Sequence, residues 1–159
     1  MSISKKRAAA THEAAHAVIA DALGFELCRV TIVPNGKMRG ACEYLRFKSR
    51  EAIWRDLSVT LAGALAQWRA EGKKPPEKMS EVLEWLEHVS KIDADNFRNN
   101  LRAYCGSDLD LGRTFAELFQ WTENLLDLHA NNVRVLSDIL MSNGTVEHDL
   151  LRDVLNILA

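Results

Sequence analysis

The pattern of apolar and polar residues predicts helices over most of the chain, beginning at its N-terminus. The first such segment runs from about Ile3 to Leu23 and consists mostly of alanine and other residues that favour helices. Ser2 or Ser4 can cap its start, and Gly24 can end it in a left-handed turn. We therefore expect a first helix over these residues.

The next two segments have the β-branched and aromatic residues that are typical of strands. They run from Cys28 to Pro34 and from Gly40 to Phe47. The Asn35-Gly36 pair between them favours a tight turn. The sequence therefore predicts one small β-hairpin after the first helix.

After the hairpin the apolar positions return to a helical period. Pro75 and Pro76 exclude helix from one short segment, and Gly144 ends a long one. Further helices are expected at about 51–70, 77–89 and 94–104, then one long helix or two over 109–141, and a last short helix from Thr145 to Leu158. The predicted fold class is mainly α, with one small hairpin, in a single domain over residues 1–159.

Composition and charge narrow the expected setting of this domain. A chain of 159 residues with 47% hydrophobic and 26% charged residues has the make-up of a globular protein. Its net charge of -2 gives no electrostatic reason to expect nucleic acid or an anionic membrane as partner. No apolar run approaches the roughly 20 residues that span a bilayer, and the N-terminus lacks the hydrophobic region of a signal peptide. Three cysteines without a Cys-x-x-Cys pair fit reduced thiols, so we expect a cytoplasmic protein.

The candidate chemistry lies in the first helix, in the stretch ATHEAAHAVIA. His12 and His16 would lie one helical turn apart, so that both imidazoles can reach one zinc ion. Glu13 projects towards the same side, where its carboxylate can take a proton from a water molecule that zinc has made more acidic. The spacing predicts a zinc site with a general base, and the alternative is a coincidental match in an alanine-rich helix.

A catalytic zinc site of this kind needs a third protein ligand. We expect His88, His129 and His148 to be ordinary helix residues, because each has charged neighbours in a predicted helix. Asp108 and Asp110 stand at the start of a long apolar helix, where a carboxylate could face inward. As first-turn residues they could equally cap that helix.

Several segments, in order, resemble the peptidase domain of FtsH-type AAA proteases. THEAAHAVIADAL is similar to the family's HEAGH helix, and CRVTIVPNGKMRGACEYL to the strand and turn that follow. LSVTLAGALAQ resembles the LAGRAAEE helix, with Gly63 at the shared glycine, and the closing NLLDLHANNVRVLSDILMSNGTVEHDLL follows the final helices. GSDLDLGRT resembles the segment GAxxDLxxAT, which aligns Asp110 with its aspartate. The resemblance implies a helical, zincin-like peptidase domain with zinc on His12, His16 and Asp110, Glu13 as the general base, and Asp108 as the alternative third ligand.

The chain also departs from the family pattern. Residues 72–105 insert a Pro-rich break and two predicted helices before Asp110, and no Walker-type glycine-rich loop is present. We therefore expect a stand-alone metallopeptidase whose substrate is an unfolded or extended polypeptide, paired with the strand from Cys28 to Pro34. A separate ATPase or further copies of the chain would be its other partners. The alternatives are a catalytically silent peptide-binding or adaptor module of the same fold, and a helical domain in which the HEAAH is incidental.

Overall fold

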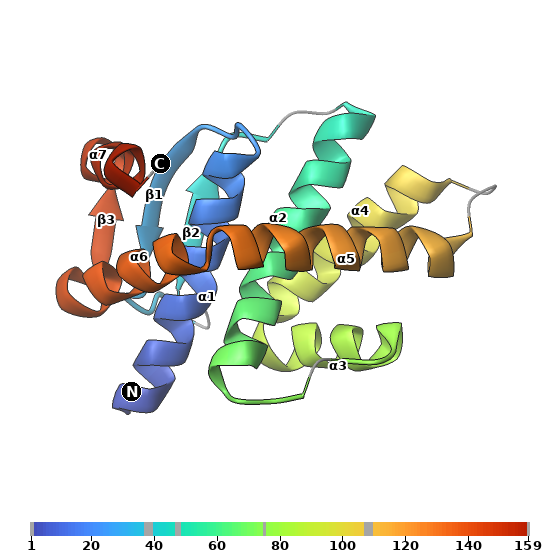
Figure 1. The fold of residues 1–159 in the computed structure, drawn as a ribbon, viewed down its shortest axis with the longest axis horizontal. Coiled ribbons are helices and arrows are strands. Elements are labelled where there is room, and N and C mark those ends of the chain that lie inside the picture. The colour runs from blue at the N-terminus through green and yellow to red at the C-terminus, as the bar shows by residue number, and fades with distance from the viewer. Residues whose placement is uncertain (1, 37–39, 47–48, 75, 107–109, 159) are drawn as a thin grey trace.

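The computed structural model describes residues 2–36, 40–46, 49–74, 76–106 and 110–158. Within these ranges the chain forms seven helices and one three-stranded antiparallel sheet, which confirms the predicted mainly α fold with a hairpin (Figure 1). The helices are α1 (Ile3–Ala22), α2 (Arg50–Ala70), α3 (Met79–Val89), α4 (Lys91–Cys105), α5 (Leu111–Leu128), α6 (Ala130–Asn143) and α7 (His148–Leu158). The strands are β1 (Leu27–Thr31), β2 (Ala41–Tyr44) and β3 (Thr145–Glu147).

The first helix, α1, lies between the sheet and α2 (Figure 1). Every residue from His12 to Ala20 is buried, as expected for a helix that has neighbours on all sides. Its alanines have little bulk, so α2 can pack close beside it. The hydroxyl of Ser2 accepts a hydrogen bond from the backbone N–H of Lys5, and Gly24 follows the helix with φ of 79°. The predicted start and end of this helix are therefore confirmed.

The sheet has the order β2-β1-β3, with β1 in the middle. Val30 of β1 pairs with Cys42 of the predicted hairpin and with Val146 on the other side. The third strand was not expected, because the sequence predicted a helix from Thr145. That prediction was wrong for three residues: Val146 is fully buried, and β3 satisfies the second edge of β1 before α7 begins. Since both edges of β1 are taken, the expected pairing of a substrate with this strand is also wrong.

The long helical segment near the C-terminus divides into two helices at His129. In Figure 1, α5 and α6 follow one another almost in line and cross α1 and α2. Gly144 has φ of 77° and ends α6, as predicted. The two helices thus cover one side of the α1–α2 pair.

Residues 72–105, which the family resemblance treats as an insertion, carry α3 and α4, and both helices pack against α2. The indole N–H of Trp85 donates a hydrogen bond of 2.8 Å to the carbonyl of Ala64, and Phe97 is fully buried. The helices α3 and α4 are therefore part of the core that surrounds α2.

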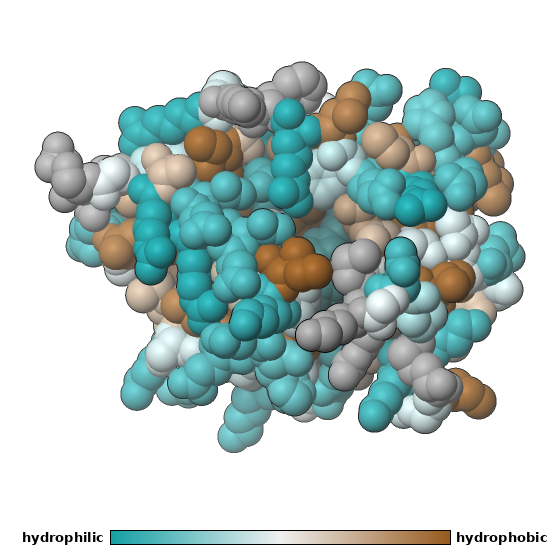
Figure 2. All heavy atoms as spheres, turned by 180° about the vertical axis from the view of Figure 1, so that it is seen from behind, coloured by the Kyte–Doolittle hydropathy of each residue, from teal (hydrophilic) through white to brown (hydrophobic). Residues whose placement is uncertain are grey.

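The described surface gives little indication of a partner. Hydrophobic side chains on the rear face form several separate groups between hydrophilic ones (Figure 2). Among the described helices, none is long and apolar enough to cross a membrane. The homo-oligomer expected from the family resemblance stays a prediction.

Candidate metal centre

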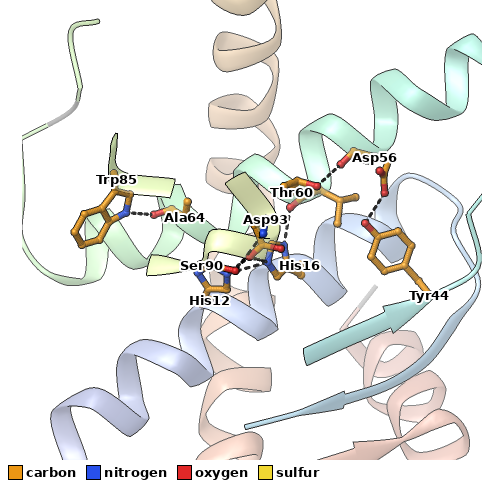
Figure 3. A network of polar contacts seen from close by, with 10 residues as sticks. His12, His16, Tyr44, Asp56, Thr60, Ala64, Trp85, Ser90 and Asp93 are labelled. Atoms are coloured by element: carbon orange, nitrogen blue, oxygen red, sulfur yellow. Dashed lines mark hydrogen bonds and ion pairs between the residues drawn. The ribbon is translucent and has the colours of Figure 1, made fainter. Parts of the chain in front are cut away.

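Three side chains that could hold a metal ion, from two helices, converge beside α2 (Figure 3). Nε2 of His12 lies 2.9 Å from Nε2 of His16 and 3.1 Å from Oδ2 of Asp93. Nε2 of His16 lies 3.6 Å from the same carboxylate oxygen. A tetrahedral zinc ion with ligands at about 2.0–2.1 Å holds its donor atoms about 3.3 Å apart. The three separations lie on either side of that value, so these residues fit a zinc ion.

Asp110, the third ligand implied by the family resemblance, lies elsewhere. It is exposed, and its Oδ1 accepts hydrogen bonds from the backbone N–H groups of Gly112 and Arg113, at 2.9 and 3.3 Å. The carboxylate thus caps α5, a position that the unpaired N–H groups and the helix dipole favour. Asp108 lies outside the described residues. The structure brings Asp93, and not Asp110, to the two histidines.

Asp93 was not singled out from the sequence, although it carries a local signal. The Ser90 hydroxyl accepts a hydrogen bond of 3.2 Å from the backbone N–H of Asp93, as an N-cap residue does. A serine followed three residues later by an acid indicates the start of a helix. That pattern places Asp93 in the first turn of α4, yet it does not tell which neighbouring helix the carboxylate meets.

The orientation of His16 leaves its Nε2 free to bind a metal. Its Nδ1 donates a hydrogen bond of 2.8 Å to the backbone carbonyl of Val59, which requires the proton to be on Nδ1. Gly63, one turn further along α2, provides the space for the ring. A Cβ atom at this glycine would lie 2.5 Å from Nε2 of His16. Gly63, the glycine that the family resemblance pointed to, therefore borders the site directly.

His12 depends on the other members of the site for its orientation. Its Nδ1 is buried and has no hydrogen-bond partner among the described residues. Its Nε2 faces both Asp93 and His16. In the metal-free protein a proton on Nε2 can bridge His12 to Asp93, and a metal ion would take the place of that proton.

Glu13 lies beside the donor atoms and is only 8% exposed. Burial raises the pKa of its carboxyl, while the neighbouring His12 and His16 act in the opposite sense. Gly40 packs against it so closely that a Cβ there would lie 2.7 Å from Oε1. A confined carboxylate with a raised pKa is suited to take up a proton from a neighbouring water molecule.

The two charged partners of the site shift each other's pKa. Burial alone would lower the pKa of His16, but the hydrogen bond and charge of Asp93 raise it to about 9. Burial acts to raise the pKa of Asp93, yet the two histidines hold it well below its usual range. The metal-free site therefore keeps a proton on His16, opposite an ionised Asp93.

The site thus offers two imidazoles and one carboxylate as ligands, with a second carboxylate next to them. This donor set is typical of zinc in catalytic sites, where three protein ligands leave a position for water or substrate. No protein-family model matches the chain, and a search of the curated proteins finds no match either.

Proposed function

We propose that this chain is a zinc-dependent metallopeptidase that hydrolyses peptide bonds in unfolded or extended polypeptides. His12, His16 and Asp93 would hold the zinc, and Glu13 would be the general base. The convergence of the three donor atoms, with Glu13 buried next to them on the same helix, carries this proposal. The resemblance of the segments around Glu13 and Gly63 to FtsH-type peptidases supports it.

Zinc, when bound, supplies a Lewis acid that polarises a carbonyl group and makes water more acidic. Glu13 takes the proton from the attacking water, and its raised pKa favours holding that proton until the leaving amine accepts it. Val59 orients His16 through its carbonyl oxygen, which accepts a hydrogen bond from Nδ1. Gly40 restricts the movement of the Glu13 carboxylate.

An extended substrate would add to β2. This strand lies at the outside of the sheet, and its outer edge is unpaired within the described part of the chain. Gly40 immediately precedes β2 and packs on Glu13. A polypeptide paired with β2 would therefore pass beside the general base, and backbone pairing would accept many sequences. Folded proteins have no free strand to offer, so they would need a separate ATPase to unfold them.

Metal content and cleavage of unfolded casein test this proposal together. The purified protein should hold about one zinc per chain and cleave casein, with a native globular protein left intact. Glu13→Gln should keep the zinc and lose about 100-fold or more of the cleavage rate, since general-base catalysis contributes about 10²–10⁴-fold. Glu84→Gln changes an exposed glutamate of α3 and should behave as wild type. A protein that cannot be loaded with zinc would disprove the proposal.

The near closure of the site favours a second candidate, a peptide-binding module without turnover. The side chains of His12, His16 and Asp93 are 6%, 8% and 22% exposed, which leaves a substrate little access. In that case wild type would bind zinc and an extended peptide, and Glu13→Gln would change neither. Cleavage of casein that depends on Glu13 would exclude this candidate.

A further inference from the structure

A second buried polar cluster lies close to the metal centre, around Asp56 of α2. The carboxylate of Asp56 accepts hydrogen bonds of 2.6 Å from the hydroxyl of Tyr44 and from Nδ2 of Asn100. Nε of Arg46 lies 3.2 Å from the same carboxylate. Asp56 is 5% exposed, so these three partners have to compensate for the loss of water around its carboxylate. The cluster thus joins β2, α2 and α4.

Two of these elements, α2 and α4, also supply residues that contact or form the metal centre. On α2, Asp56 shares a helical face with Val59 and Gly63, the two residues that contact His16. On α4, Asn100 follows Asp93 by seven residues, which is about two turns and the same face. Figure 3 shows the His16–Asp93 group and Asp56 at successive positions along α2. The helix α4 is therefore held at two levels, to α1 by the candidate metal ligands and to α2 by the hydrogen bond from Asn100 to Asp56.

We propose that Asp56 and Asn100 are positioning residues that hold α4 in the place where Asp93 meets His12 and His16. This inference rests on the proposed metal site and adds what controls its third ligand. Apolar packing of α4 through residues such as Phe97 has little directionality, so it allows the helix to slide or turn slightly. The hydrogen bond from Asn100 to the buried carboxylate of Asp56 restricts such a movement, because a shift of α4 would leave Asp56 without one of its partners.

The matched variants Asn100→Ala and Asn99→Ala test the proposal. Both remove an asparagine side chain from α4, but Asn99 is exposed. Zinc affinity is measured by competition with a chelator, at a temperature where circular dichroism shows every variant folded. Asn100→Ala should lower the zinc affinity by about tenfold or more, a loss typical of mutating residues that support metal ligands. Asn99→Ala should have the zinc affinity of wild type. Equal affinity of the two variants would overturn the proposal.

A double-mutant cycle with Asp93→Ala shows whether the effect passes through Asp93. Once Asp93 is removed, Asn100→Ala should weaken zinc binding no further. An equal loss in both backgrounds would mean that Asn100 acts on the fold in general, and the proposal would fail.

A second pair of variants covers the case in which Asn100→Ala does not fold. Asn100→Asp places a second carboxylate against Asp56 and should weaken zinc binding, while Asp56→Asn with Asn100→Asp restores a carboxylate–amide pair. The double variant should recover most of the zinc affinity that Asn100→Asp loses. A double variant that recovers none of it would count against the proposal.

The metal-free protein separates this inference from the proposed function. If wild type binds no zinc, the metallopeptidase proposal fails, but the positioning of α4 can still be measured by amide hydrogen exchange. Asn100→Ala should then speed exchange in the first turns of α4 about tenfold relative to Asn99→Ala. Identical exchange in the two variants would overturn the inference by itself.

Discussion

At Gly63 the lack of a side chain decides whether His16 can take its place in the site. Alanine normally stabilises a helix interior by about 1 kcal/mol relative to glycine. At this position the added methyl group would overlap the imidazole, so Gly63→Ala should instead destabilise the protein by about 1–3 kcal/mol and weaken zinc binding. Urea unfolding and chelator competition measure the two effects.

Gly112→Ala is the control for this substitution. Gly112 is exposed in the first turn of α5, and a Cβ there would meet only Oδ1 of Asp110, at 3.3 Å. The variant should be as stable as wild type or more so, with unchanged zinc affinity. If Gly63→Ala behaved in the same way, the close contact with His16 would be refuted.

The proton on His16 predicts how zinc binding depends on pH. Asp93 and Glu13 overcome the effect of burial and raise the pKa of His16 from 6.5 to about 9 in the folded, metal-free protein. Below pH 6.5 both folded and unfolded chains bind this proton, whereas between 6.5 and about 9 only the folded chain keeps it. The stability that this proton gives to the metal-free protein is therefore complete below pH 6.5 and is lost as the pH rises through about 9.

Zinc affinity should change in the opposite direction, because zinc has to displace the same proton. It should rise about tenfold per pH unit and level off near pH 9. Chelator competition at a series of pH values measures the slope. His88→Ala, which removes an exposed histidine, should leave the slope unchanged, and an affinity independent of pH would contradict the prediction.

At the scale of the elements, Asp110 caps α5 whereas Asp93 is the candidate metal ligand, so variants of the two aspartates should have different effects. Asp110→Ala removes the acceptor for two backbone N–H groups and should cost about 1 kcal/mol of stability without changing zinc affinity. Asp110→Asn keeps a good cap and should stay close to wild type. Asp93→Ala should lose most zinc binding. If Asp110→Ala lost it instead, Asp110 would be the third ligand.

Elements with a clear local signal were predictable, and short or interrupted ones were not. The first helix follows from a long run of residues that favour helices, and the hairpin from β-branched and aromatic residues on either side of Asn35-Gly36. β3 has only three residues, too few to show an alternation, and its pairing depends on the free edge of β1. The division of the long helix at His129 has no glycine or proline to mark it.

For the molecule as a whole, the site was predictable as far as it lies in one helix. His12, Glu13 and His16 share α1, so their spacing alone brings them together. Asp93 lies 81 residues from His12, and it reaches the site only because α4 packs against α2. Contacts of this kind depend on the packing of whole helices, which no local pattern encodes. The family resemblance pointed to Asp110 instead, because it compares matching segments in order. Residues 72–105, which supply Asp93, have no counterpart among those segments.

Zinc should stabilise the whole molecule, because its ligands join α1 to α4. At a free zinc concentration of about 100 times Kd, binding contributes about 2.7 kcal/mol. For a chain of this size that corresponds to a rise in Tm of about 5–10 °C. Thermal unfolding with zinc and with chelator measures the shift, which His12→Ala should abolish and His148→Ala, at an exposed residue, should keep. A Tm that does not respond to zinc in wild type would contradict a site that bridges the two helices.

The separation of Asp93 from His12 also has a consequence for the timing of biosynthesis. A nascent chain that ends before α4 already contains both histidines and Glu13, but it has no third ligand. The newly made chain is itself an unfolded polypeptide, the kind of substrate that we propose for this protein. Because the donor set is complete only after α4 has docked, a chain interrupted before α4 would lack the proposed hydrolytic activity. Incomplete chains would then be unable to digest one another during synthesis.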